Sequence, residues 1–281
     1  MLKKLTEEKL SEILECGISE FAEHGFESAS MKTIAQRAGI SVGVLYYAGL
    51  VPCITASMMG YLVSRVMGVE PTRFTVPVPE VNGWAMVLVA VLAILCAVVS
   101  ILFCEGLHWV EHFAAKWFKN TFLRAVIGGG IIIGLTLLLG TDYNGAGMDI
   151  VGLAVAGQAK PWAWLLKLVF TAITIGCGFK GGEVVPSFFI GATFGCVAAT
   201  LLSLPVGFGA AIGLIAVFCG AVNCPVASII LSVELFGSGS LLYFALSCGI
   251  AYMLSGYFGI YKSQKIMYSK TRAEFINRYA R

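Results

Sequence analysis

Residues 178–195 read GFKGGEVVPSFFIGATFG, a glycine-rich loop that runs into an apolar segment with a proline near its start. Lys180 and Glu183 are the only charged residues within positions 169–232. Pro186 suits the first turn of a helix, where its missing N–H group would have no intrahelical partner. The stretch therefore predicts a helix that begins inside an apolar part of the chain.

The start of this predicted helix has the properties of an anion site. Free N–H groups and the positive end of the helix dipole attract negative charge, and glycines let the backbone approach an ion closely. Glu183 competes with an anion for the same donors, so its protonation would couple protons to the ion; an ionisable group inside a membrane is a functional candidate by default. The alternative is that Glu183 pairs with Lys180 or caps the helix, and only holds the loop. The predicted anion-binding residues of this loop are Gly182, Glu183, Val184, Val185 and Pro186, with Gly181 and Lys180 shaping it.

The composition places most of the chain in a membrane. Of its 281 residues 58% are hydrophobic and 12% charged, with a mean hydropathy of +0.86, whereas soluble domains carry about 25% charged residues. This excludes a disordered chain, an ordinary soluble enzyme and a protein that is only a nucleic-acid module. No nucleotide-binding or hydrolase motif occurs, so neither an enzyme nor a cofactor is predicted. The net charge of +3 selects no partner.

Apolar segments divide the chain after the first 47 residues. They cover residues 48–67, 83–104, 125–141 and 161–178. The long uncharged run that follows Glu183 is cut by Pro186, Pro205 and Pro225. Such helix-breaking prolines are typical of short, broken or half-depth helices. A membrane tolerates these helices only where they are buried in protein or line a cavity. Small-xxx-small pairs that permit close helix packing are Gly130/Gly134, Gly191/Gly195 and Gly209/Gly213.

Candidate metal ligands are present but do not form a convincing site. Nine cysteines occur without a CxxC motif, most of them in apolar runs where Cys behaves as a small hydrophobe. His108–His112 has the H-x-x-E-H order of inverted zincins, but it ends an apolar segment and matches the composition of a membrane-interface helix. We expect no disulfide and no metal.

Residues 1–47 form a soluble head with a helix-turn-helix pattern. Apolar spacing predicts helices at Glu12–Ala22 and Met31–Ala38, then a turn at Gly39 and a third segment. The pieces FAEHGF, TIAQRAGIS and LYY resemble the DNA-binding N-terminus of TetR-type repressors. That resemblance implies DNA contacts from Ser41, Val42, Tyr46 and Tyr47. However, the head carries 5 basic and 7 acidic residues, a net charge of −2, whereas DNA binding needs a basic surface, so DNA is not an expected partner.

The apolar part of the chain resembles the CLC family of anion channels and anion/proton antiporters. The loop GFKGGEVVP fits the family's GGxxxP signature, and GFKGGE is closest to the fluoride/proton antiporter branch, although Val185 stands where that branch often has a hydroxyl residue. Three further stretches carry the resemblance, which covers roughly residues 48–272. They are Gly145–Gly157, Ala216–Phe236 and Ser255–Ile266, the last resembling a terminal helix whose Tyr261 reaches the anion.

The resemblance implies the second of two inverted repeats of a halide transporter. It implies fluoride or chloride as the ion, with or without protons, and Tyr261 as a donor to it. It also implies homodimers through helices near Ala48–Met67, Asn223–Leu235 and Leu241–Ser255. No counterpart of the first repeat, with its gating glutamate, occurs in the chain. Two alternatives stay open: an inactive fusion or truncation fragment, and a membrane-tethered TetR-like DNA-binding regulator.

We therefore expect an all-α, polytopic membrane protein with broken helices, the second repeat of a CLC-type fold, behind a short soluble helix-turn-helix head. The expected domains are residues 1–47, 48–272 and a basic tail at 273–281. Six basic residues follow Tyr261, which predicts a cytoplasmic C-terminus by the positive-inside rule. The expected location is the bacterial inner membrane, with the lipid bilayer as a partner.

Overall fold

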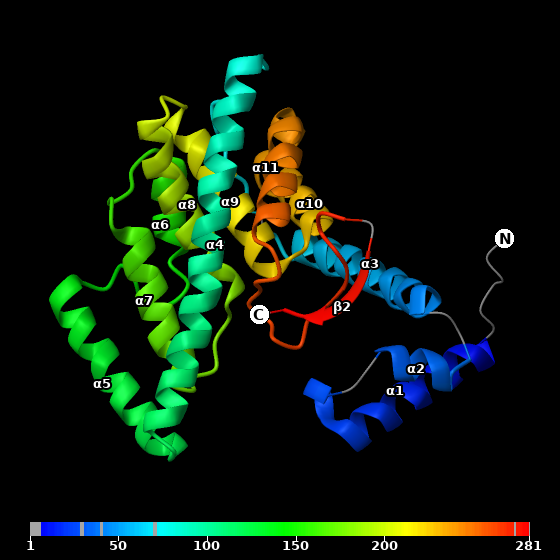
Figure 1. The fold of residues 1–281 in the computed structure, drawn as a ribbon. Coiled ribbons are helices and arrows are strands. Elements are labelled where there is room, and N and C mark those ends of the chain that lie inside the picture. Colours follow the sequence, from blue (N-terminus) through cyan, green and yellow to red (C-terminus); the bar gives the residue numbers. More distant parts are fainter. Residues whose placement is uncertain (1–6, 29–30, 40–41, 70–71, 273, 281) are drawn as a thin grey trace. The chain divides into compact units, whose positions relative to one another are not determined.

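The computed structural model describes residues 7–28, 31–39, 42–69, 72–272 and 274–280 (Figure 1). It divides into two compact units, Met1–Thr72 and Arg73–Arg281, which we call the N-terminal unit and the C-terminal unit. Helices dominate both units, as the hydrophobic pattern predicted.

The N-terminal unit has the order of a helix-turn-helix. It contains α1 (Glu7–Ser28), α2 (Met31–Arg37) and α3 (Val42–Val66). Its small core joins Ile13 of α1 to Ile34, Ala35 and Ala38, all of which are buried. Gly39 makes the turn after α2 with a φ of 60°, a left-handed conformation that glycine adopts at little cost.

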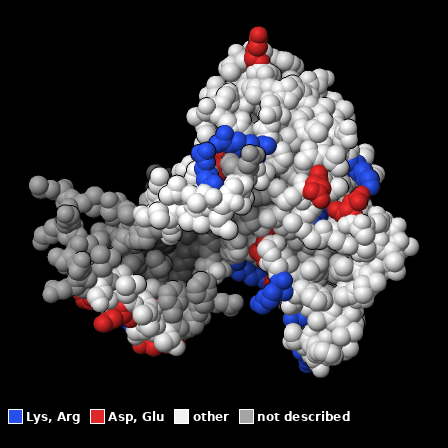
Figure 2. Space-filling view, turned by 180° about the vertical axis from the view of Figure 1, so that it is seen from behind, with Lys and Arg blue, Asp and Glu red and all other residues white. Residues whose placement is uncertain are grey.

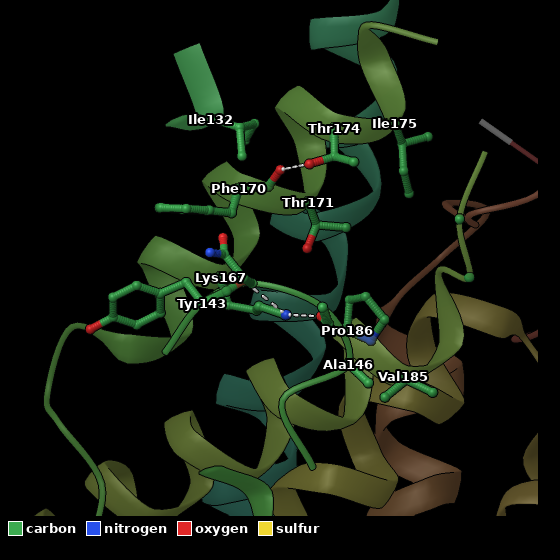
Figure 3. Close-up of a pocket in the computed structure, with 14 residues that line it drawn as sticks. Ile132, Tyr143, Ala146, Lys167, Phe170, Thr171, Thr174, Ile175, Val185 and Pro186 are labelled. Atoms are coloured by element: carbon green, nitrogen blue, oxygen red, sulfur yellow. Dashed lines mark hydrogen bonds between the residues drawn. The ribbon is translucent and has the colours of Figure 1, made fainter. Parts of the chain in front are cut away.

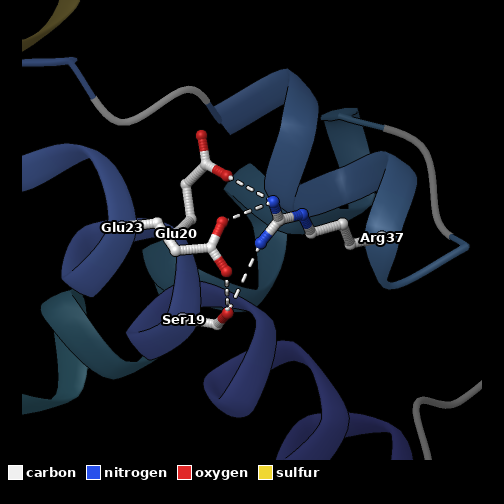
Figure 4. A network of polar contacts seen from close by, with 4 residues as sticks. All are labelled: Ser19, Glu20, Glu23 and Arg37. Atoms are coloured by element: carbon white, nitrogen blue, oxygen red, sulfur yellow. Dashed lines mark hydrogen bonds and ion pairs between the residues drawn. The ribbon is translucent and has the colours of Figure 1, made fainter.

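A polar network also links α1 to α2 (Figure 4). The Arg37 guanidinium donates to a carboxylate oxygen of Glu23 at 2.8 Å and to the hydroxyl of Ser19 at 3.4 Å, and it lies 3.7 Å from a carboxylate oxygen of Glu20. The pairing raises the pKa of Arg37, chiefly through the Glu23 bond. These contacts of Arg37 hold the short helix α2 against α1.

Helix α3 crosses the boundary expected between residues 47 and 48. It runs without interruption from Val42 to Val66, and the division between the two units follows Thr72. Along α3 the apolar side chains of Ile54, Met58 and Leu62 are exposed, one turn apart. The composition becomes apolar after residue 47, and the boundary was expected there, but α3 continues through this change of composition.

The C-terminal unit is a bundle of helices of unequal length. Three of its described helices, α4, α5 and α8, are long and apolar enough to cross a membrane. On the face that Figure 2 presents, charged side chains are sparse on this unit. Its elements are α4 (Gly83–Trp117), α5 (Thr121–Leu139), α6 (Met148–Val155), α7 (Ala163–Gly176), α8 (Val184–Leu201), α9 (Val206–Val222), α10 (Pro225–Phe236), a 3-10 turn (Ser238–Ser240), α11 (Leu241–Leu254), β1 (Lys265–Tyr268) and β2 (Phe275–Tyr279).

Prolines mark the breaks in the long uncharged run, as predicted. Pro186 is the third residue of α8, Pro205 directly precedes α9, and Pro225 is the first residue of α10. Asn223 ends α9 in a left-handed conformation with a φ of 58°, which asparagine tolerates better than most residues. The run therefore folds as three separate helices instead of one long one.

The core of the C-terminal unit is the contact between α8 and α9. Every residue from Gly207 to Ala221 is buried, and α4 and α11 pack against the same helix. The predicted glycine pairs Gly191/Gly195 and Gly209/Gly213 face one another, because a Cβ atom on any of the four would overlap atoms of the other helix. The pair Gly130/Gly134 has no neighbour within 4 Å of an added Cβ among the described atoms, so it packs no helix there.

The terminal helix expected at Ser255–Ile266 is wrong. Helix α11 ends at Leu254, and Gly256 turns the chain with a φ of 56°. The segment then runs without helix or strand past the end of α9, where the Ile260 amide donates to the carbonyl oxygen of Ala221 at 2.9 Å. Strands β1 and β2 follow as an antiparallel hairpin with a register shift between Ile266 and Tyr268. This hairpin is the one departure from an all-helical fold within the described residues.

Candidate functional site

The loop of residues 177–183 ends one helix and starts another within the C-terminal unit. After α7, Gly178 turns the chain with a φ of 95°, and its amide donates to the carbonyl oxygen of Ile175 at 2.9 Å. An added Cβ at Gly178 would lie 3.2 Å from the Arg124 guanidinium, so a second cation borders this loop. The glycine therefore serves both the turn and the close approach of Arg124.

Helix α8 begins at Val184 with an uncapped end. Glu183 occupies the N-cap position, but its side chain makes no capping hydrogen bond. Among the described residues, the N–H groups of Glu183, Val184 and Val185 find no acceptor. Uncapped amides at a helix start carry a positive partial charge. Pro186 is buried one turn inside, so the free donors lie at the edge of the core.

Glu183 and Lys180 do not form the ion pair that the sequence left open. Glu183 is half-buried and Lys180 is exposed, and no salt bridge involves either residue in the described part of the chain. The negative charge of Glu111 on α4 acts on Glu183. Glu111 is itself paired with Lys262 at 2.5 Å. The carboxylate at the start of α8 is thus free of a cation partner.

The structure brings Tyr261 into the region of Glu183. Tyr261 follows Ile260, which the backbone bond to α9 fixes in place. Partial burial raises the pKa of the Tyr261 phenol, and the negative charge of Glu183 raises it further. No hydrogen bond joins the two side chains in the described part, and Tyr261 is 42% exposed. The charge of Glu183 therefore reaches Tyr261, but no hydrogen bond joins the two predicted residues in the described part.

A cavity of about 520 Å³ borders the loop (Figure 3). The predicted residues Gly181, Gly182, Val185 and Pro186 form one wall. The remaining walls come from α5, from the segment before α6 and from α7. They comprise Ile132, Tyr143, Asn144, Gly145, Ala146, Lys167, Phe170, Thr171, Thr174 and Ile175.

Lys167 is the charged residue of this cavity. Its side chain is 2% exposed, and its ammonium donates to the carbonyl oxygens of Gly145 at 2.6 Å and Tyr143 at 3.1 Å. It also lies 5.0 Å from the centre of the Phe189 ring. Gly147 has a φ of 70°, and a Cβ there would overlap the Phe189 ring and lie 3.7 Å from the Lys167 ammonium. The segment before α6 can approach Lys167 because glycine stands at that position.

Sequence reasoning did not place Lys167 and Thr171 beside the predicted loop, where both line the cavity. Lys167 is the sole charge in the apolar segment at 161–178, and such an isolated charge is a signal of function. Thr171 carries no comparable signal, since threonine is ordinary in apolar helices. The contact of Lys167 with residues 143–145 joins positions more than twenty residues apart, and periodicity does not predict it.

The other predicted sites are the DNA-contact residues and the histidine motif. Ser41 lies outside the described residues, as do the side chains of Val42, Tyr46 and Tyr47, so the DNA-contact prediction stays a prediction. His108 binds the carbonyl oxygen of Gly259 through Nε2 at 2.9 Å. The described residues contain no group of three His, Cys, Asp or Glu side chains that could hold a metal.

Comparison with known families covers both parts of the chain. The family described as Voltage gated chloride channel matches residues 40–256. The family described as Bacterial regulatory proteins, tetR family, matches residues 13–48. The two matches overlap at residues 40–48, around the start of α3, in agreement with the two resemblances in the sequence.

Curated relatives and solved structures agree with the larger match. A protein named chloride/fluoride channel protein, from Pseudomonas syringae pv. tomato, is 36% identical over 239 residues, which are 82% of this chain and 53% of that protein. The chloride channel protein CLC-f of Arabidopsis thaliana is 28% identical over 65% of this chain and 27% of its own length. The chain thus spans about half or less of the length of these relatives.

The fold is that of a solved antiporter. The crystal structure of a CLC-type fluoride/proton antiporter superposes with a TM-score of 0.75 at 27% identity, over 88% of this chain and 66% of the other. A eukaryotic CLC transporter, with a TM-score of 0.54 at 16% identity over 86% of this chain and 43% of the other, shows the same fold. Since the family match covers more than half of its residues, the chain belongs to the voltage gated chloride channel, or CLC, family.

Proposed function

We propose that this chain supplies the C-terminal half of a pathway that carries fluoride or chloride across a membrane. The observation that carries the proposal is the uncapped start of α8, where amides and a carboxylate, Glu183, that have no partner among the described residues occur together in an apolar unit. Free amides at a helix start stabilise an anion. The names of the relatives in Pseudomonas syringae and among the solved structures support a halide as that anion.

Glu183 is proposed to couple protons to the ion. When ionised, its carboxylate occupies the positive field at the start of α8 and repels a halide; when protonated, it leaves the field to the halide. No cation partner among the described residues holds Glu183 in the ionised state. Tyr261 is proposed as a hydroxyl donor to the ion, because it lies near enough to interact with the charge of Glu183.

The pathway is proposed to be completed in a homodimer. Helix α10 exposes Val226, Ile230 and Val233 along one face, spaced as residues of one helix stripe are. An apolar face of this kind fits a second copy of the chain or lipid. The proposed setting is a bacterial inner membrane with the C-terminus in the cytoplasm, where six basic residues after Tyr261 favour that orientation.

A liposome experiment tests the transport proposal. The full chain is reconstituted into vesicles loaded with fluoride, and efflux is followed with a fluoride electrode, with and without a pH gradient. We expect efflux that a pH gradient drives in the wild type and that Glu183→Gln abolishes. The matched control is Asp142→Asn, which removes an exposed carboxylate paired with Lys160 at 2.6 Å and should leave efflux unchanged.

The other outcomes separate the alternatives. No efflux from wild-type vesicles would refute transport by this chain and favour an inactive fusion or truncation fragment. Efflux that is unchanged in Glu183→Gln would refute the coupling role while transport stands. Efflux of both fluoride and chloride at equal rates would assign the chain to a pathway that does not select between them.

A further inference from the structure

Two threonines on α7 differ in what their hydroxyls bind. The hydroxyl of Thr174 donates to the carbonyl oxygen of Phe170 at 2.7 Å, within its own helix. Thr171 is 7% exposed, yet its hydroxyl makes no hydrogen bond with any residue that the structure describes. Figure 3 shows this hydroxyl directed into the cavity. A hydroxyl that opens onto a cavity without a protein partner can donate to a water molecule or a ligand held there.

Lys167 lies one helical turn before Thr171, and its position places a charge on the same wall. Its ammonium has three N–H donors, and it makes two hydrogen bonds to backbone carbonyl oxygens. Among the residues that line the cavity, Lys167 is the one with a charged side chain. A buried charge without a counter-charge is costly, and an anion in the cavity would offset that cost.

The wall formed by the loop before α8 offers backbone and apolar side chains to the cavity. Gly181 and Gly182 bring bare backbone to the cavity, and Val185 and Pro186 make the rest of this wall apolar. A water molecule takes about 30 Å³ in the liquid, so a volume of about 520 Å³ accommodates a halide with much of its hydration shell. The few donors and the absence of a second lining cation fit a small monovalent anion better than a phosphate.

We propose that Lys167 and Thr171 form a halide-binding site in this cavity, apart from Glu183 and Tyr261, which holds the ion in a partly hydrated state beside the start of α8. The Thr171 hydroxyl donates to the ion, and the Lys167 ammonium supplies the charge. This inference rests on the proposed function for its choice of ion. It adds a binding step that the uncapped helix start does not by itself require.

Equilibrium binding tests the site without depending on transport. The purified full chain in detergent is titrated with sodium fluoride and with sodium chloride, and binding is followed by calorimetry. Thr171→Val keeps the shape of the side chain and removes its hydroxyl; the dissociation constant should rise by roughly tenfold or more, the loss of one hydrogen bond to a charged ligand. Thr171→Ser should restore binding.

The matched control is Thr193→Val. Thr193 is a buried threonine of α8 outside the cavity, and its hydroxyl bonds the carbonyl oxygen of Phe189 at 2.7 Å. We expect Thr193→Val to bind halide as the wild type does. Thermal unfolding of Thr171→Val should show no loss of stability, because its hydroxyl has no bond to lose within the described chain.

Each further outcome decides the proposal. Equal binding by Thr171→Val and the wild type overturns the site, as does equal weakening in Thr171→Val and Thr193→Val, or a wild type that binds no halide. Halide binding that depends on Thr171, without efflux from vesicles, supports the site and refutes the proposed transport. If vesicles show efflux and halide binding is the same with and without the Thr171 hydroxyl, the site is refuted and the transport proposal is not affected.

Discussion

Gly191 of α8 and Gly213 of α9 face each other so closely that a Cβ atom on either residue would overlap the carbonyl oxygen of the other. Gly195 and Gly209 repeat the contact one turn along. Close backbone approach of this kind needs small residues. Because α8 carries the candidate site at its first turn, the contact with α9 fixes where the free amides lie.

The first prediction follows from this contact. Gly213→Ala should destabilise the C-terminal unit by about 1–3 kcal/mol, the usual cost of forcing an extra methyl group into a packed interface. The midpoint of thermal unfolding in detergent, followed by tryptophan fluorescence, should fall. Gly130→Ala is the control, since an added Cβ there meets nothing within 4 Å. Equal midpoints for Gly213→Ala and the wild type would contradict the packing.

The second prediction concerns the bond between Lys167 and the segment before α6. Lys167→Met leaves the carbonyl oxygens of Tyr143 and Gly145 without their donor. Local opening of residues 143–150 should become easier by about 1–3 kcal/mol, the cost of an unsatisfied buried acceptor. Hydrogen exchange measured by mass spectrometry should accelerate in peptides from this segment. Lys160→Met, which removes an exposed neighbour, is the control, and equal exchange in both variants would sink the prediction.

The third prediction is a pH dependence in the C-terminal hairpin. Lys270 donates to the side chains of Asn223 and Ser255 and lies 4.3 Å from the centre of the Tyr252 ring. Burial lowers the pKa of Lys270 from 10.5 to about 8, and the nearby thiols of Cys219 and Cys104 act in the opposite direction. The unfolded chain therefore binds more protons between these two values, so stability due to Lys270 rises with pH across that window.

Comparison with Lys270→Met isolates this effect. We expect the wild type to gain stability over the variant as the pH is raised through about 8 toward 10.5, because deprotonation removes the cost of burying the charge. Thermal unfolding of both proteins across the window gives the difference and cancels the titration of other groups. A difference that is flat, or that falls as the pH rises, contradicts the burial of a protonated Lys270.

The fourth prediction concerns the N-terminal unit. We expect the full chain in detergent to cause no gel shift of double-stranded DNA at physiological ionic strength, because residues 1–47 carry a net charge of −2 and phosphate contacts dominate such binding. Arg37, a basic residue of α2, is engaged with Glu23. A shift that weakens steeply with added salt would instead support a DNA-binding regulator.

The sequence predicted the breaks in the membrane part and two of its three close-packing glycine pairs because their causes are local. Pro205 and Pro225 end hydrogen-bonded runs wherever they occur, and the spacing of Gly191 and Gly195 puts two small residues on one helix face. The uncapped start of α8 follows from Gly182 and Pro186 in the same way. These features need no knowledge of the rest of the fold.

Features that depend on distant residues were not predictable in this way. The irregular segment after Gly256 is held by the bond between Ile260 and Ala221, which lie far apart in the chain, so the helix expected there was wrong. The different environments of Thr171 and Thr174 arise from the cavity beside α7. Helical periodicity places both threonines on one helix but says nothing about what each hydroxyl meets.

The central claim is that the free amides at the start of α8 bind a halide. Nuclear magnetic resonance of the nitrogen-15-labelled chain in lipid, titrated with fluoride, tests it directly. The account predicts saturable shifts of the amide resonances of Glu183, Val184 and Val185, with none at Gly130. Resonances at the start of α8 that stay unmoved while fluoride crosses the same membranes would contradict it.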